Sequence, residues 1–112
     1  MLGSWADADP ACQDLYDRAT AILGYDLAEV CRNGPADKLN TTAVSQPALL
    51  VTSLAALTIL EGRADSPLPH IRMAAGLSLG EYTALVFAGS LEVDDAIRVV
   101  AERGRAMQDC AE

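Results

Sequence analysis

The chain has 112 residues, which limits it to one domain at most, or to part of one. Its hydrophobic fraction of 51% is that of a globular protein and excludes disorder of the whole chain. Sixteen acidic residues against eight Lys and Arg give a net charge of −8. This balance argues against a nucleic-acid partner, because binding phosphate groups requires a basic face.

Three cysteines, Cys12, Cys31 and Cys110, lie far apart and show no C-x-x-C spacing. With one histidine and no clustered ligands we expect no metal site, and the odd cysteine count favours reduced thiols over a secreted disulfide framework. No apolar run approaches the ~18 residues of a membrane span. The start of the chain also lacks the basic region of a signal peptide. We therefore expect a cytoplasmic protein without a membrane partner.

Two helices are predicted in the first third of the chain. Asp9-Pro10 is typical of an N-cap followed by proline at the first helical position. Apolar residues then recur at helical spacing as far as Leu23, and Gly24 stands where a helix commonly ends. A shorter helix is predicted over about Leu27 to Cys31, ended by Asn33-Gly34-Pro35.

The rest of the chain is predicted to contain three more helices and one strand. Gln46-Pro47 should open a helix that runs to about Leu60 and is apolar nearly all round, as buried helices are. After a surface loop, His70 to Ala75 is predicted as a short buried strand. Helices are then expected from Gly80 to Ala88 and from about Asp94 to Cys110. A lone buried strand needs partners, so the pattern indicates part of a larger α/β domain or partner strands from another chain.

Between the predicted strand and helix lies Gly76-Leu77-Ser78-Leu79-Gly80, a G-x-S-x-G sequence typical of a nucleophile elbow. The tight turn strains the serine backbone, requires small flanking residues and presents the hydroxyl at a helix N-terminus. There the amide of Leu79 can donate to an oxyanion. Because this short motif also occurs by chance, the alternative is a glycine-rich turn in which Ser78 merely caps the helix.

Longer blocks of the sequence resemble malonyl-CoA:acyl-carrier-protein transacylases, a family of serine acyltransferases. Residues 76–89 are similar to its G-H-S-L-G-E-Y-x-A-L-x-x-A-G block, residues 45–50 to T-Q-P-A-L-L, and residues 103–108 to R-G-x-x-M-Q. Residues 23–27 resemble L-G-x-D-L, and residues 33–42 resemble G-P-x-x-x-L-x-x-T. The blocks follow the family order over nearly the whole chain.

The resemblance implies an α/β fold, with this chain as a mostly helical part of the α/β-hydrolase-like subdomain of acyltransferases that holds about one short strand. It implies transfer of a malonyl group from malonyl-CoA to the thiol of acyl carrier protein, in fatty-acid biosynthesis, through a serine ester and without a cofactor. The alternatives are an acyltransferase domain of a polyketide synthase, an unrelated esterase of the α/β-hydrolase type, and an inactive truncated chain.

The resemblance also implies roles for four residues. Ser78 would be the nucleophile, and Arg103 matches the arginine that pairs with the malonyl carboxylate. The Leu79 amide would be an oxyanion donor, and Gln46 would line the substrate pocket. The alternatives are that Arg103 is a solvated helix arginine and that Gln46 is a polar residue at a helix start.

Three departures from the family pattern bear on activity. Leu77 stands where the family usually has histidine. The family's first strand with its G-Q-G-x-Q loop, and its catalytic histidine, are not found in residues 1–112. We therefore expect a partial acyltransferase domain over residues 1–112 that is inactive by itself. His70 would start the predicted strand ~20 Å from the elbow, too far to act as the base.

Overall fold

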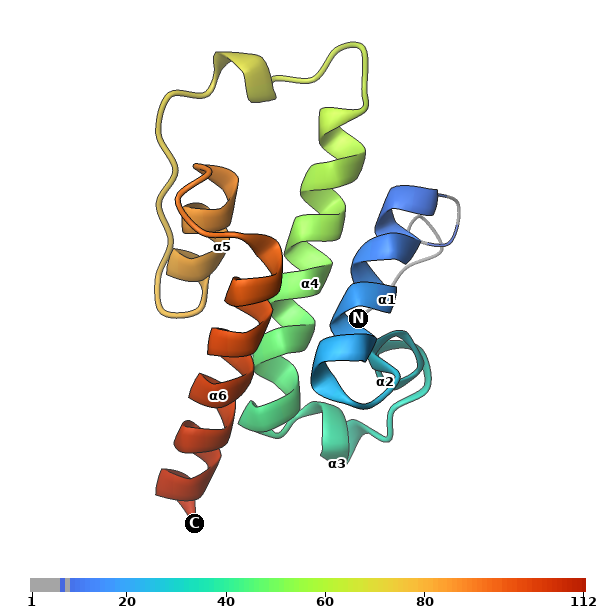
Figure 1. The fold of residues 1–112 in the computed structure, drawn as a ribbon, viewed down its shortest axis with the longest axis vertical. Coiled ribbons are helices and arrows are strands. Elements are labelled where there is room, and N and C mark those ends of the chain that lie inside the picture. The colour runs from blue at the N-terminus through green and yellow to red at the C-terminus, as the bar shows by residue number, and fades with distance from the viewer. Residues whose placement is uncertain (1–6, 8) are drawn as a thin grey trace.

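The computed structural model describes residues 7 and 9–112 (Figure 1). Within them the chain is helical: α1 (Pro10–Leu23), α2 (Leu27–Asn33), α3 (Ala36–Leu39), α4 (Thr42–Glu61), a 3-10 turn η2 (Leu68–His70), α5 (Gly80–Phe87) and α6 (Val93–Ala111). The mostly helical character expected of this chain is confirmed. No strand forms within residues 9–112, so the expectation of one short strand is wrong for this structure.

Local capping explains the bounds of α1 and α2, which match the prediction closely. The Asp9 carboxylate accepts a hydrogen bond from the N–H of Ala11, and Pro10 occupies the first turn. Gly24 ends α1 in the left-handed conformation, with φ of 83°. Asp26 then caps α2 by accepting from the N–H of Glu29. These short-range signals lie in the sequence itself and need no distant contact.

The core is formed where α4 passes between α1 and α6, as Figure 1 shows. Leu50 and Val51 of α4 and Ile97 and Val100 of α6 are 0% exposed. Burying a side chain of this size stabilises the fold by roughly 1.5–3 kcal/mol. The three long helices therefore form the stable part of the chain, and they position the residues that α4 and α6 carry.

Helix α4 begins at Thr42, so the prediction of a start at Gln46-Pro47 is wrong. The N–H groups of Val44 and Ser45 bond to the carbonyl of Thr41 and close an earlier turn. The N–H of Thr42 itself donates to the side chain of Gln108 on α6, 66 residues away. A hydrogen bond to α6 thus supports a first turn of α4 that was not predicted from the neighbouring sequence.

Its early start gives α4 20 residues, and the helix meets the length and hydropathy of a membrane span. The expectation that no apolar run approaches this length is therefore wrong. The same profile describes the core helix of a soluble protein, and 44% of the qualifying window is buried inside the structure. Because α4 packs against both α1 and α6, the faces that it turns to these helices are buried, while Leu49 on another face is 44% exposed.

The segment from His70 to Ala75 was predicted as a buried strand, and this prediction is wrong for the structure. Residues 71–75 have no regular secondary structure, and His70 ends the turn η2 instead of starting a strand. The side chains of Ile71 and Met73 are 45% and 87% exposed. The described residues offer no neighbouring strand to pair with this backbone, so its apolar sequence does not lead to burial.

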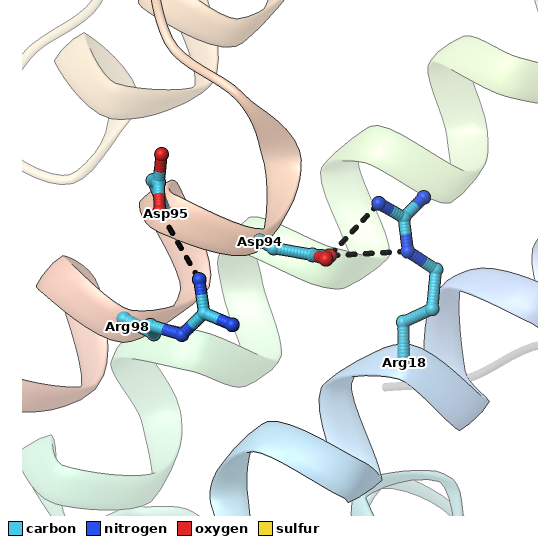
Figure 2. Close-up of polar contacts among 4 residues, drawn as sticks. All are labelled: Arg18, Asp94, Asp95 and Arg98. Atoms are coloured by element: carbon cyan, nitrogen blue, oxygen red, sulfur yellow. Dashed lines mark hydrogen bonds and ion pairs between the residues drawn. The ribbon is translucent and has the colours of Figure 1, made fainter.

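An ion pair links α1 to the start of α6, as Figure 2 shows. The Nη2 of Arg18 lies 2.8 Å from the Oδ1 of Asp94, and Asp95 pairs with Arg98 within α6 at 3.1 Å. Both aspartates lie in the first turn of α6, the positive end that was expected to suit them. Exposed pairs of this kind contribute about 1 kcal/mol or less. The Arg18–Asp94 pair helps to orient α1 and α6, while burial holds these helices together.

The three cysteines are free thiols. Cys12 and Cys31 are buried where α1 and α2 pack, and burial raises the pKa of both thiols. Cys110 is exposed near the end of α6. Among the described residues no three His, Cys, Asp or Glu side chains gather in a group that could hold a metal ion.

Candidate active site

The backbone around Ser78 forms a tight and strained turn. Ser78 has φ of 56°, and no other residue except glycine has a positive φ in the part of the chain that the structure describes. A Cβ at position 76 would lie 2.1 Å from the carbonyl group of Gly80, so only glycine fits there. A Cβ on Gly80 would meet nothing within 4 Å. The prediction that the flanking positions must be small is therefore confirmed at Gly76. At Gly80 the described residues leave room for a larger side chain.

Backbone hydrogen bonds make this turn continuous with the first turn of α5. The N–H of Gly80 donates to the carbonyl of Leu77 at 3.0 Å, and the N–H of Glu81 donates to that of Ser78 at 3.2 Å. The Leu79 side chain is buried at 9% exposure and anchors the turn in the core. Within the described residues the Leu79 N–H has no hydrogen-bond partner, so it is available to a ligand.

Arg103 of α6 lies at the centre of the site. Its Nη2 donates to the Oγ of Ser78 at 2.8 Å, and its Nη1 donates to the Oε1 of Gln46 on α4. The guanidinium carbon lies 5.7 Å from the centre of the Tyr82 ring. Arg103 is thus held by three other side chains, which does not fit the alternative of a freely solvated helix arginine.

The structure brings together the four residues singled out from the sequence. Gln46, Ser78 and Arg103 form one hydrogen-bonded chain from α4 through α6 to the elbow, and Leu79 follows Ser78 directly. Ser78 does not cap α5, because its oxygen accepts from Arg103 and α5 has no side-chain cap. Tyr82 was missed by sequence reasoning; it lies on the first turn of α5, where its ring contacts the guanidinium of Arg103.

These groups offer a specific set of chemical capabilities. A permanently charged guanidinium beside a serine hydroxyl can bind an anionic group of a ligand that the serine also contacts. Arginine cannot accept the serine proton, because it stays protonated at any working pH. His70, which is exposed at the end of η2, makes no hydrogen bond to Ser78 in the described structure. The site as described thus brings together a serine hydroxyl, an unpaired backbone N–H and a guanidinium, groups that can serve as a nucleophile, an oxyanion donor and an anion-binding group.

Comparison with known proteins identifies the class to which this site belongs. Residues 3–112 match the acyl transferase domain family, and the chain belongs to that family. The resemblance to malonyl-CoA:acyl-carrier-protein transacylases is confirmed at the level of individual relatives. The chain is 42% identical over 112 residues to the malonyl CoA-acyl carrier protein transacylase of Escherichia coli K12, covering 97% of this chain and 34% of the relative. It is 41% identical over 103 residues to the mitochondrial malonyl-CoA-acyl carrier protein transacylase of Mus musculus, covering 92% of this chain and 27% of the relative.

Solved structures agree with this assignment. The malonyl transacylase MCAT of Streptococcus pneumoniae superposes with a TM-score of 0.84 at 43% identity, over 94% of this chain and 33% of that one. A malonyl-transacylase solved in complex with its type II PKS acyl-carrier protein superposes with a TM-score of 0.83 at 41% identity, over 97% of this chain and 34% of that one. The chain thus spans about a third of the length of the relatives that it matches.

Proposed function

We propose that residues 1–112 provide the nucleophile and the acyl-recognition arginine of a malonyl-CoA:acyl-carrier-protein S-malonyltransferase of fatty-acid biosynthesis. The observation that carries this proposal is the 2.8 Å hydrogen bond from Arg103 to the hydroxyl of Ser78, made while Gln46 holds the other side of the guanidinium. A cation fixed beside a strained serine suits a substrate with an anion close to its reacting carbon.

Malonyl-CoA has this geometry. Its free carboxylate carbon lies two single bonds from the thioester carbon, a span of ~2.5 Å. A guanidinium that contacts the attacking oxygen is therefore also close to the carboxylate of a bound malonyl group. Arg103 would exchange its contact with Ser78 for a bidentate contact with that carboxylate, which an acetyl group lacks. The site would then favour malonyl over acetyl.

The proposed reaction has two acyl-transfer steps. The Ser78 oxygen attacks the malonyl thioester carbon, the bond to sulfur breaks, and CoA leaves as its thiol with the proton that the serine gave up. The malonyl group stays on Ser78 as an ester. The thiol sulfur of acyl carrier protein then attacks the ester carbon, the bond from that carbon to the Ser78 oxygen breaks, and the thiol proton goes to the serine oxygen, so that the malonyl group leaves as a thioester of the carrier protein. In both steps the Leu79 N–H would donate to the oxygen on which negative charge develops.

We further propose that residues 1–112 form part of an acyltransferase domain with an α/β-hydrolase-like subdomain. In this arrangement a first strand and the histidine base come from segments outside residues 1–112. The mostly apolar, non-helical stretch of residues 71–75 before the strained Ser78 supports this, because the segment before the serine is the strand position of a nucleophile elbow. No metal or redox cofactor has a role in the proposed steps.

The compartment is a prediction from the reduced cysteines. The relatives do not decide it, since bacterial and mitochondrial transacylases resemble the chain to the same degree, 42% and 41%. The expectation of no nucleic-acid partner rests on the net charge of −8.

A hybrid enzyme tests the proposed function. Residues 1–112 replace the matching segment of the Escherichia coli transacylase, to which they align over 97% of their length. Incubation with malonyl-CoA should add one malonyl group to the hybrid, seen by intact-protein mass spectrometry. Ser78→Ala should abolish the adduct, whereas Ser90→Ala, at an exposed serine beyond α5, should retain it. A malonyl adduct on the Ser78→Ala protein would remove Ser78 from the mechanism.

A further inference from the structure

Helices α4 and α6 touch backbone to backbone next to the site. Gly104 is buried in the middle of α6, and a Cβ there would lie 2.5 Å from the carbonyl oxygen of Thr42 and 3.1 Å from the Cα of Ala43. A glycine inside a helix costs about 1 kcal/mol relative to alanine. The close approach to the first turn of α4 explains its presence, because any larger residue would push the helices apart.

Side-chain hydrogen bonds reinforce this close approach. The Thr42 hydroxyl lies 3.0 Å from the carbonyl oxygen of Gly104 and 3.1 Å from the Oε1 of Gln108, with one proton to share between these acceptors. The Thr42 N–H also donates to the Gln108 side chain at 3.1 Å. We name these interactions the Thr42–Gly104–Gln108 contact. They tie the start of α4 to one face of α6.

This contact lies next to the hydrogen bonds of Arg103. Thr42 and Gln46 are four residues apart on α4 and so share a face, one helical turn of about 5.4 Å apart. Arg103 directly precedes Gly104 on α6 and bonds to Gln46. Thr42 and Gln46, one turn apart on α4, therefore contact Gly104 and Arg103, which are adjacent on α6. Together they fix both the distance between the helices and their relative register.

We propose that the Thr42–Gly104–Gln108 contact is a positioning element, which sets the spacing and register of α4 and α6 so that the Arg103 guanidinium lies between Gln46 and Ser78. It acts through Arg103 and touches no substrate. The inference rests on the proposed function, since it makes this contact responsible for how well Arg103 distinguishes a carboxylate-bearing acyl group from acetyl. A displacement of 1 Å at a reacting centre costs about a hundredfold in rate.

The test compares substitutions at the contact in the hybrid enzyme. Thr42→Val removes the hydroxyl at nearly constant volume, Thr42→Ser restores it, and Gly104→Ala widens the crossing. The control is Gly62→Ala at the other end of α4, where a Cβ meets its first neighbour only at 3.6 Å. Thr42→Val should lower the ratio of kcat/KM for malonyl-CoA to that for acetyl-CoA by about tenfold, mainly through the malonyl-CoA KM. Gly104→Ala should lower it further, and Thr42→Ser and Gly62→Ala should leave it unchanged.

Arg103→Ala separates failure of this inference from failure of the proposed function. It should collapse the same ratio, and adding Thr42→Val to it should change the ratio no further. An unchanged ratio in Arg103→Ala would refute the carboxylate role and the positioning role together. If Arg103→Ala lowers the ratio but Thr42→Val lowers only the melting temperature, the contact is merely structural and the inference is overturned.

A second measurement follows the Arg103 side chain itself in the hybrid enzyme and does not depend on turnover. Exchange of the Arg103 Nη protons with water, followed by nuclear magnetic resonance, should become faster in Thr42→Val than in the parent hybrid. The guanidinium of Arg105, which pairs with Glu102 on the exposed side of α6, provides the internal reference and should not change. Equal exchange of the Arg103 protons in parent and variant would also overturn the inference.

Discussion

The three-helix core and the segment of residues 71–79 are both rich in apolar residues, yet they differ sharply in burial. Leu50 and Ile97 in the core are 0% exposed, whereas Met73 and Leu77 in the segment are 87% and 91% exposed. A helix satisfies the hydrogen bonds of its backbone internally and needs neighbours only to bury its side chains. An extended segment needs partners for its backbone as well. Apolar sequence therefore gives a stable core only where the chain also supplies the partner.

The same contrast separates the parts of the site. Arg103 and Gln46 come from the packed helices and hold each other. Ser78 comes from the exposed segment and is held at its turn by Gly76 and Leu79. Beside this segment lies a hollow of about 440 Å³, lined mostly by apolar residues that include Met73 and Phe87. The position of Ser78 thus depends on its surroundings more than the positions of Arg103 and Gln46 do.

The largest expected effect is on activity of the 112-residue chain alone. We expect no measurable malonyl transfer to acyl carrier protein, while the hybrid enzyme transfers it. General-base catalysis alone contributes about 10²–10⁴-fold, and no base contacts Ser78 within the described residues. The exposed segment should also make the isolated chain bind apolar dyes and tend to aggregate. Steady turnover by a pure, well-folded monomer would contradict this expectation and would return His70 to consideration as the base.

The second largest effect should be on stability, where substitutions in the three-helix core should cost far more than substitutions in the exposed segment. Leu50→Ala removes a fully buried side chain of α4 and should lower the free energy of unfolding by about 2–5 kcal/mol. Met73→Ala changes a side chain that is 87% exposed and should stay within about 0.5 kcal/mol. Urea unfolding followed by circular dichroism measures both in the 112-residue chain. Equal losses would mean that the segment is as well packed as the core.

Two glycine substitutions compare the two ends of the turn at residues 76–80. Gly76→Ala places a methyl group 2.1 Å from the Gly80 backbone, so the turn must open and Ser78 must move away from Arg103. In the hybrid enzyme malonyl-serine formation should fall by about a hundredfold, with helix content unchanged. Gly80→Ala meets no described atom within 4 Å, so its folded chain should keep its helix content and the Ser78 turn. Rapid-quench mass spectrometry and circular dichroism measure the two effects, and normal acylation in Gly76→Ala would contradict the structure.

The smallest effect concerns alkaline pH and the core alone. Burial raises the pKa of Tyr16 from 10.0 to about 12, while its hydroxyl lies 2.8 Å from that of Thr52. The folded state therefore keeps a proton that the unfolded state releases above pH 10, and this contribution to stability is present below pH 10 and lost as pH rises towards 12. The melting temperature should fall over that range. It should fall less steeply in Tyr16→Phe, and an identical slope would assign the loss to other groups.

Local and distant information explain what the sequence could and could not predict. Asp9, Gly24 and the acidic first turn of α6 are short-range signals, and the helix bounds they mark were predicted well. The start of α4 is supported by a hydrogen bond to Gln108, 66 residues away, and no local pattern indicates that contact. The strand prediction was wrong because an apolar run reports a preference for burial and says nothing about whether a partner strand is present.

The candidate site was better predicted than the fold around it. The motif at residues 76–80 and the family resemblance together singled out Gln46, Ser78, Leu79 and Arg103, and these residues lie together in the structure. Their catalytic roles stay predictions. The role of Gly104 could not be read from the sequence, because a glycine inside a helix shows its reason only when the backbone that approaches it is known.

The three cysteines differ in exposure, so their rates of reaction with a thiol reagent would report how often the helices separate. Cys110 is exposed on the last turns of α6, while Cys12 and Cys31 are enclosed in the core, and the sulfur of Cys12 lies 3.4 Å from the carbonyl oxygen of Ala55. A thiol reagent should therefore label one position quickly and the other two only when the helices separate. Burial, which raises the pKa of both enclosed thiols, further suppresses their thiolate form. The rate at which the second and third labels appear would measure how often α1 and α2 detach from α4.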